Sequence, residues 1–194
     1  MDDCKPTDTQ MSTNTKLDID DSGIKAGYHV YIGLWYPKGA SFELLSYSNL
    51  DFAGCRVERK STSGDCYLLG RSLVSWLSKK QNCISLSTAE AEYIAAGSCC
   101  TQILYIKVKL SRVPLLCDNE SAVKLTNNLV QHSRTKHIDI RHHFIRDHIA
   151  KGDIQLRNVG TKEQLADIFT KNLDESTFHR LRSELNVLDV RTIM

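Results

Sequence analysis

Acidic and amide side chains at five separated positions could serve one metal-dependent reaction. They are Asn49, Asp51, Glu92, Asp118 and Asp167. Gathered carboxylates repel one another, so they persist mainly where divalent cations neutralise their charge. In two-metal enzymes, a pair of Mg²⁺ ions about 3.5–4 Å apart activates a water and stabilises the leaving oxygen of a phosphodiester. The residue types therefore predict a two-metal phosphodiesterase, with either Asn49 or Asp51 completing the set.

Each acid also has an ordinary structural explanation. Glu92 alone is explained as a carboxylate at the rim of the core, paired with a Lys or Arg, and Asp118 as the N-cap of the segment after it. Asp167 would be a favourable charge near a helix N-terminus, worth only ~0.3–1 kcal/mol. Each explanation suffices for its own residue. Together they do not explain why the acids recur at strand ends and near helix starts.

The helix that must position Glu92 is the clearest element in the sequence. Ser87 and Glu90 form a capping box, which predicts a helix that starts there and runs to about Ile106. Helical spacing from Glu92 reaches a narrow face of small and apolar side chains, which are Ala95, Ala96, Cys99 and Ile103. Such a face suits close packing against a sheet, where a carboxylate loses its hydration and needs a cation or a strong donor.

The chain before this helix has the pattern of antiparallel strands. The predicted strands cover 30–36, 42–48, 66–69 and 73–76. The first two are expected to be joined by a hairpin-like connection at 37–39, which contains Pro and Gly. The basic stretch 78–81 is expected to form a loop that leads into the helix.

The chain after this helix alternates between strands and helices. The predicted elements are a strand over 115–117, a short helix over 120–125, a helix over 135–150, a strand over 154–159 and a final helix over 175–185. Thr161 and Gln164 form a second capping box, which predicts a helix through Phe169 with Asp167 in its second turn. The expected fold class is α/β, a mixed sheet flanked by helices, in which ligand sites gather at the carboxyl ends of strands.

Length and composition predict one folded domain with flanking segments. The 194 residues, of which 41% are hydrophobic, suffice for one sizeable core. Residues 1–27 are polar without periodicity and are expected to be disordered, 28–172 to form the domain, and 173–194 to form a C-terminal helix and tail. The net charge of +2 is too small to indicate a nucleic-acid binder by itself.

Cysteine usage and hydropathy indicate an intracellular protein. The seven cysteines form no CxxC pair and are scattered through apolar stretches, which predicts reduced thiols in place of a zinc site or a disulfide framework. No signal peptide or long apolar span is present, so neither secretion nor a membrane is expected. The expected location is the cytoplasm or the nucleus.

Six short motifs occur in the order found in one family. They cover residues 47–54, 59–64, 87–93, 116–119, 134–139 and 163–171. Together they resemble the ribonuclease H domain at the C-terminal end of the Pol polyprotein of copia-type LTR retrotransposons, plant ones especially, over roughly residues 33–189. Residues 4–20 resemble the chain that follows the reverse transcriptase core of the same polyprotein.

The resemblance implies a ribonuclease H-like mixed five-stranded sheet and cleavage of the RNA strand of RNA–DNA hybrids with two Mg²⁺ ions, for which Mn²⁺ can substitute. It makes Glu92, Asp118 and Asp167 three of the family's four catalytic, metal-binding acids. The fourth position is degenerate, because Asn49 stands where the family has an aspartate. Asp51 lies ~6–7 Å further along the strand and could replace that acid only if the backbone shifted.

The resemblance also points to a nucleic-acid interface. The candidate contacts are Arg59, Lys60, Ser61, Lys79, Lys80, Asn119, Arg134, Lys136 and His137. Basic side chains would meet phosphates through salt-dependent, sequence-independent attraction, and Ser or Asn would donate to sugar or phosphate. The alternative for the basic side chains is a solvated surface. The polyprotein context adds a reverse transcriptase as the expected protein partner.

Two departures from the family indicate a shortened, decayed copy of a mobile element. The chain is several dozen residues shorter than the related polyproteins between Lys5 and Leu34, and it has a short connection between Tyr105 and Val113. Two functional hypotheses follow. One is a ribonuclease H enzyme weakened by Asn49, and the other is a non-catalytic relic that keeps the fold and weak hybrid binding.

Overall fold

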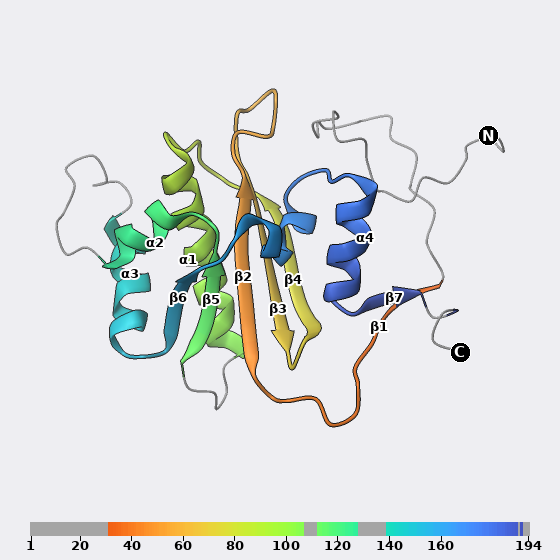
Figure 1. Ribbon diagram of the computed structural model, residues 1–194. Helices are drawn as coiled ribbons and strands as arrows, with labels where there is room; N and C mark the ends of the chain where they lie inside the picture. The colour runs from red at the N-terminus through yellow and green to blue at the C-terminus, as the bar shows by residue number, and fades with distance from the viewer. Residues whose placement is uncertain (1–30, 107–111, 128–138, 190, 192–194) are drawn as a thin grey trace.

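The computed structural model describes residues 31–106, 112–127, 139–189 and 191. Within these ranges the chain forms two sheets flanked by helices (Figure 1). The strands are β1 (Ile32–Leu34), β2 (Leu44–Asp51), β3 (Thr62–Leu69), β4 (Ser72–Lys80), β5 (Val113–Cys117), β6 (Ile154–Asn158) and β7 (Val187–Asp189). The α-helices are α1 (Thr88–Ile106), α2 (Glu120–Asn127), α3 (Asp139–Ala150) and α4 (Glu175–Glu184), and two short 3₁₀ helices are η2 (Thr161–Glu163) and η3 (Leu165–Phe169).

The larger sheet has five strands in the order β4-β3-β2-β5-β6. β2, β3 and β4 are antiparallel neighbours, whereas β5 runs parallel to both β2 and β6. Helix α1 and the chain after it carry the polypeptide from β4 across to β5, because a parallel neighbour needs a crossover connection. The expected fold class, a mixed five-stranded sheet flanked by helices, is confirmed.

Each face of this sheet carries its own core, because successive side chains along a strand point to opposite faces. In β3, Tyr67 belongs to a cluster with Ile145 of α3 and with the buried side of α1. Its neighbours Cys66 and Leu68 belong to a second cluster, to which α4 contributes Leu181. Figure 1 shows α1, α2 and α3 gathered around β5 and β6, with α4 on the far side of the central strand β2.

The predicted hairpin between the first two strands is wrong. β1 pairs in antiparallel fashion with β7, near the other end of the chain, with Ile32 opposite Asp189 and Leu34 opposite Val187. β1 cannot pair with β2, because β2 is hydrogen-bonded to β3 on one side and to β5 on the other. The chain ends of the described fold are therefore joined in a separate two-stranded sheet.

Helix α1 begins and ends as the sequence predicts. The Glu90 amide donates to Ser87 Oγ at 3.2 Å, as expected for a capping box. The Glu90 carboxylate instead accepts from the Leu86 amide at 2.8 Å, one residue before the expected donor. The small, apolar face of the helix is fully buried against the sheet, and its members Ala95, Ala96, Cys99 and Ile103 are all 0–1% exposed.

Two further local predictions differ from the structure. Lys79 and Lys80 lie in β4 and not in a loop, because Ser63 and Thr62 of β3 continue the antiparallel pairing to them. The helix predicted from the second capping box is replaced by η2 and η3, with Gln164 between them. The Gln164 side chain accepts from the Ala166 amide and donates to Ser48 O of β2 at 3.0 Å, so it anchors η3 to the sheet.

Several predictions fall on residues outside the described ranges. These are the segment 1–27, the start of the helix predicted over 135–150, and the candidate contacts Arg134, Lys136 and His137. Among the described cysteines, all six are free thiols, as the sequence predicts. None of the helices in the described ranges is long and apolar enough to cross a membrane.

Candidate active site

The site lies at one edge of the larger sheet, where the parallel strands β2 and β5 end. Asn49 lies near the end of β2, and Asp118 follows β5 directly. Since Tyr47 of β2 is paired with Leu116 of β5, the two strand ends meet at the same edge. Helix α1 adds Glu92 from its second turn. An open depression of about 400 Å³ is lined by Asn49, Glu92 and Asp118, together with Glu120 and Lys171.

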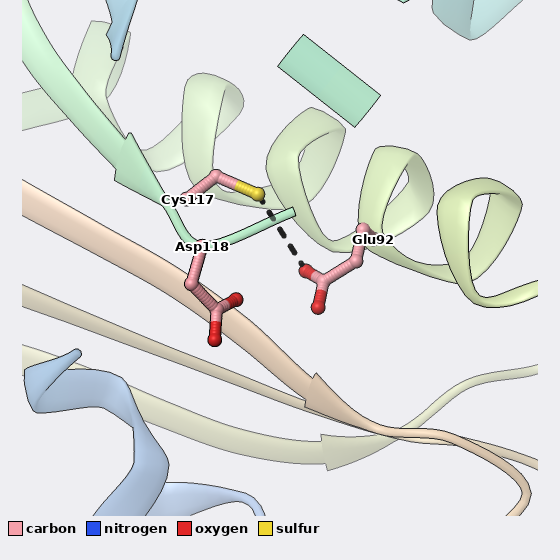
Figure 2. A group of neighbouring side chains, drawn as sticks. All are labelled: Glu92, Cys117 and Asp118. Atoms are coloured by element: carbon pink, nitrogen blue, oxygen red, sulfur yellow. Dashed lines mark hydrogen bonds between the residues drawn. The ribbon is translucent and has the colours of Figure 1, made fainter. Parts of the chain in front are cut away.

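Glu92, Cys117 and Asp118 form the tightest group in this depression. One ligand atom from each lies within 4.8 Å of the others, and Figure 2 shows both carboxylates facing the space between α1 and the end of β5. The Cys117 thiol donates to Glu92 Oε2 at 3.8 Å. Burial, and then the charge of Asp118, raise the pKa of Glu92 to about 8. Ionisation of Glu92 is therefore unfavourable in the absence of a cation, and a bound cation would favour it.

Asp167 lies apart from that group and is held by other partners. It lies in η3 and is 6% exposed. Its Oδ1 accepts from Asn49 Nδ2 and forms an ion pair with Lys171 Nζ at 2.8 Å. Asn49 Nδ2 also lies 3.4 Å from Thr170 Oγ1. Burial raises the pKa of Asp167, and the Lys171 ammonium opposes that rise.

The ordinary explanations for the first two acids do not match the structure. The N-cap of α2 is Asn119, whose Oδ1 accepts from the Ala122 amide at 3.0 Å, so Asp118 is not needed there. Within the described part of the chain, no lysine or arginine forms an ion pair with Glu92. The Asp51 carboxylate lies against Gly54 in the following turn, where a Cβ added to Gly54 would collide with it. It therefore does not replace Asn49.

Relatives of the chain include transposon polyproteins. It is 37% identical over 166 residues to the "Retrovirus-related Pol polyprotein from transposon RE1" of Arabidopsis thaliana, across 81% of this chain and 11% of that protein. It is likewise 37% identical over 142 residues to the Pol polyprotein from transposon TNT 1-94 of Nicotiana tabacum, across 70% of this chain and 11% of that protein. The chain thus spans only about a tenth of the length of these curated relatives. No protein-family model matches it.

Solved structures show the same fold. LC11 ribonuclease H1, solved in complex with an RNA/DNA hybrid, superposes with a TM-score of 0.52 at 12% identity, over 66% of this chain and 93% of that one. The N-terminal ribonuclease H domain of a Mycobacterium tuberculosis protein gives a TM-score of 0.50 at 11% identity, over 74% and 98%. By sequence the chain belongs with the retrotransposon Pol polyproteins, and its fold is that of a ribonuclease H domain. The family expected from the six motifs is therefore confirmed.

Three residues of this ribonuclease H region belong to the site without having been assigned a role from the sequence. Lys171 lines it, Cys117 donates to Glu92 from beneath, and Gly64 of β3 lets η3 approach the sheet. A Cβ on Gly64 would lie 2.5 Å from Thr170 Cγ2 and 3.0 Å from Ala166 O. The spacing of four between Asp167 and Lys171 was a readable signal for their ion pair. The role of Gly64 had no local signal, because its neighbour comes from a distant part of the chain.

The donors of the Pol ribonuclease H site fit a hard divalent cation. Carboxylate oxygens from Glu92 and Asp118 are the ligands that Mg²⁺ and Mn²⁺ prefer, and their mutual repulsion favours a bound cation. Asn49 offers one neutral oxygen in place of a carboxylate, and its Nδ2 is directed to Asp167. The fit is therefore good around Glu92 and Asp118 and poor around Asn49.

The expected nucleic-acid contacts differ in how accessible they are. Arg59 and Lys79 are exposed, whereas Lys60 and Lys80 both form ion pairs with Glu58, at 2.7 Å and 3.6 Å. Ser61 is 1% exposed, and its Oγ accepts from the Ala53 amide, so this hydroxyl closes the loop and does not face solvent. Asn119 lines the depression, although its side-chain oxygen is engaged in capping α2.

Proposed function

We propose that this chain is a ribonuclease H that cleaves the RNA strand of RNA–DNA hybrids with a divalent cation, and that Asn49 makes this cleavage slow. The observation that carries the proposal is the pair of facing carboxylates, Glu92 and Asp118, at the meeting point of two parallel strand ends. Ligand sites of α/β folds gather at such an edge.

The chemistry follows from the residues at this edge. When bound, a divalent cation activates a water and stabilises the leaving oxygen of a phosphodiester. Glu92 and Asp118 would hold it through oxygens that face the depression. Asn49 lines the same depression but carries no negative charge, so it attracts a cation less strongly than an aspartate would.

The substrate is proposed from the fold and the surface. LC11 ribonuclease H1 was solved with an RNA/DNA hybrid, and this chain shares its fold. Exposed Arg59 and Lys79 supply positive charge for backbone phosphates, which is the sequence-independent part of nucleic-acid affinity. Because the relatives are Pol polyproteins, a reverse transcriptase is the protein partner that we propose.

A second candidate function is a non-catalytic relic that binds hybrids weakly. The observation that favours it is the engagement of Asp167 by the Asn49 amide and the Lys171 ammonium. Together they satisfy the Asp167 carboxylate without a metal ion. This candidate shares the fold and the interface with the first and differs in the absence of cleavage.

A cleavage assay on a labelled RNA–DNA hybrid with Mg²⁺ separates the two. We expect slow cutting by the wild type, a rise of about tenfold or more for Asn49→Asp because a carboxylate attracts the cation, and loss of cutting for Glu92→Gln. Asn82→Asp, which adds the same charge in an exposed loop, serves as the matched control and should leave the rate unchanged.

The two candidates give opposite outcomes in this assay. If neither the wild type nor Asn49→Asp cuts the hybrid, while both bind it in an anisotropy titration, the enzyme proposal is overturned in favour of the relic. If neither binds hybrid more tightly than duplex DNA, both candidates are wrong.

A further inference from the structure

Strand β4 forms one end of the five-stranded sheet, and its outer edge is open along most of its length. Among the described strands β4 pairs with β3 alone, and it packs mainly on β3 and η3 (Figure 1). At its start, the Tyr36 hydroxyl donates to Leu73 O at 2.8 Å. From Ser75 to Lys79, no hydrogen bond from another described residue reaches the backbone groups that face away from β3. Such an edge is a template for pairing with a further strand.

Apolar side chains lie along this open edge. Trp76 is 52% exposed, and Leu77 is 37% exposed. Leu77 also lines a groove of about 360 Å³, together with Ile94 of α1 and Phe144 of α3. The groove therefore lies where β4 meets the helices on one face of the sheet. Exposed apolar groups next to unpaired backbone groups favour association with another strand.

Two features of β4 oppose such pairing at its ends and leave its middle free. A bulge at Val74 ends the regular part of the strand and bends the edge there. Lysines stand at the other end, where they discourage contact between edges. Of these, Lys80 already forms an ion pair with Glu58 at 3.6 Å. The stretch Ser75–Lys79 is therefore the part of the edge that can accept a strand.

This stretch is complementary to itself about Leu77. In an antiparallel pair, side chains that stand directly opposite each other lie on the same face of the sheet. With Leu77 opposite Leu77 of a second copy, Ser75 is opposite Lys79, and Trp76 is opposite Ser78. Each lysine therefore meets a hydroxyl and not a second cation, and the two leucines meet beside the groove. Like charges placed directly opposite would oppose the pairing.

We propose that two copies of this chain associate through β4, in antiparallel pairing about Leu77, so that one sheet runs through both copies. A second copy fits this edge because it supplies both the backbone hydrogen bonds and a matching leucine. Such a pair is closed, since the same patch is used on both subunits. A contact made by one strand lies at the small end of specific interfaces, so the dimer is expected to be weak. The inference does not depend on the proposed cleavage activity.

Sedimentation velocity of the full chain tests the pairing between about 5 and 500 µM, the range in which small interfaces associate. Metal and nucleic acid are left out, because Lys79 is also a proposed phosphate contact. We expect a monomer at the low end and twice the monomer mass at the high end. Leu77→Lys should abolish dimerisation, because it sets two cations opposite each other. Leu86→Lys adds the same charge at an 83%-exposed position outside the strand and should still dimerise.

Variants of Ser75 test the register and separate a charge effect from a disturbed fold. Because Ser75 is opposite Lys79 of the other copy, Ser75→Glu should tighten the dimer by about threefold to tenfold, since the new pair forms twice by symmetry. Ser75→Lys should weaken the dimer by a similar factor. The double variant Ser75→Glu/Lys79→Glu sets like charges opposite each other again and should also be weak.

Three results would overturn the pairing. One is a chain that stays monomeric over the whole concentration range. Another is a dimer that Leu77→Lys leaves intact, because a different surface would then hold the two copies together. The third is an equal dissociation constant for Ser75→Glu and Ser75→Lys, which would contradict the pairing about Leu77. Species larger than a dimer would likewise contradict a closed two-fold contact.

Discussion

Asn49 changes the site through charge and not through shape. Its amide has nearly the volume of a carboxylate and donates through Nδ2 to Asp167, while its Oδ1 remains an acceptor. An aspartate at this position would place a second negative charge beside Asp167 and raise the free energy of the ion-free fold. The substitution therefore relieves a repulsion that a bound cation would otherwise have to offset.

Asp65 is a further buried acid, beneath α1 and outside the site. It is 0% exposed, lies opposite Ser48 in the pairing of β2 with β3, and neither of its carboxylate oxygens has a hydrogen-bond partner in the described structure. Burial raises its pKa from 3.8 to about 7. Because the folded state holds the proton more tightly than the unfolded chain, stability falls as the pH rises from about 4 to about 7.

We predict that Asp65→Asn removes part of this pH dependence. At pH 8 the variant should be more stable than the wild type by roughly 2–4 kcal/mol, because a tenfold change in a protonation equilibrium corresponds to about 1.4 kcal/mol. The gain should vanish near pH 4. Thermal unfolding from pH 4 to pH 8 measures it, with Asp147→Asn on the exposed side of α3 as the control.

Asp65→Asn should not remove the whole pH dependence of stability. Glu92 also has a raised pKa, so its contribution to stability falls with pH in the same direction. If Asp65→Asn and Asp147→Asn change the pH profile equally, the burial of Asp65 does not have the assigned effect.

At the scale of elements, the approach of η3 to the sheet decides where Asp167 lies. Gly64 of β3 is paired with Asn49 of β2, and η3 packs directly on this pair. The absence of a side chain at Gly64 leaves the space into which Thr170 and Ala166 fit. Gln164 completes the arrangement by donating to Ser48 O.

We predict that Gly64→Ala destabilises the fold by about 1–3 kcal/mol, because its Cβ would lie 2.5 Å from Thr170 Cγ2 and the neighbouring backbone cannot yield freely. Urea denaturation measures this loss. Gly97→Ala in α1 is the control, since its Cβ would meet only Ile145 Cδ1 at 3.7 Å and alanine favours a helix. Equal stabilities for Gly64→Ala and the wild type would contradict the close packing of η3.

At the scale of the whole molecule, the C-terminal segment completes the domain. Helix α4 begins at the N-cap Asp174, whose carboxylate accepts from the Thr177 amide at 2.9 Å, and it covers one face of the sheet. Leu181 of α4 shares a buried cluster with Leu165 and Ala166, the residues that precede Asp167. The helix therefore supports both the fold and the η3 half of the site.

We predict that Leu181→Ala lowers the free energy of unfolding by about 2–5 kcal/mol, because a 1%-exposed leucine is replaced by a cavity. Urea denaturation followed by circular dichroism gives the value. Leu86→Ala is the control, since that side chain is 83% exposed and its loss should change little. A small effect for Leu181→Ala would mean that α4 is not part of the cooperative unit.

The amino-acid sequence alone determined helix α1 and the family. Ser87 and Glu90 marked the start of α1, the spacing from Glu92 predicted its buried face, and six motifs identified the Pol relatives. These features depend on residues within a few positions of one another, because capping and side-chain periodicity are local properties. They can therefore be recognised before any tertiary contact is known.

Only the tertiary structure decided which distant segments meet. β1 pairs with β7, since both edges of β2 are occupied. Where a longer helix was predicted, the chain forms η3, and the Gln164 side chain beside it binds β2. The structure also pairs Asp167 with Lys171, outside the tight group that Glu92 and Asp118 form with Cys117. These outcomes depend on free strand edges and on the space left beside the sheet, which local spacing along the chain does not encode.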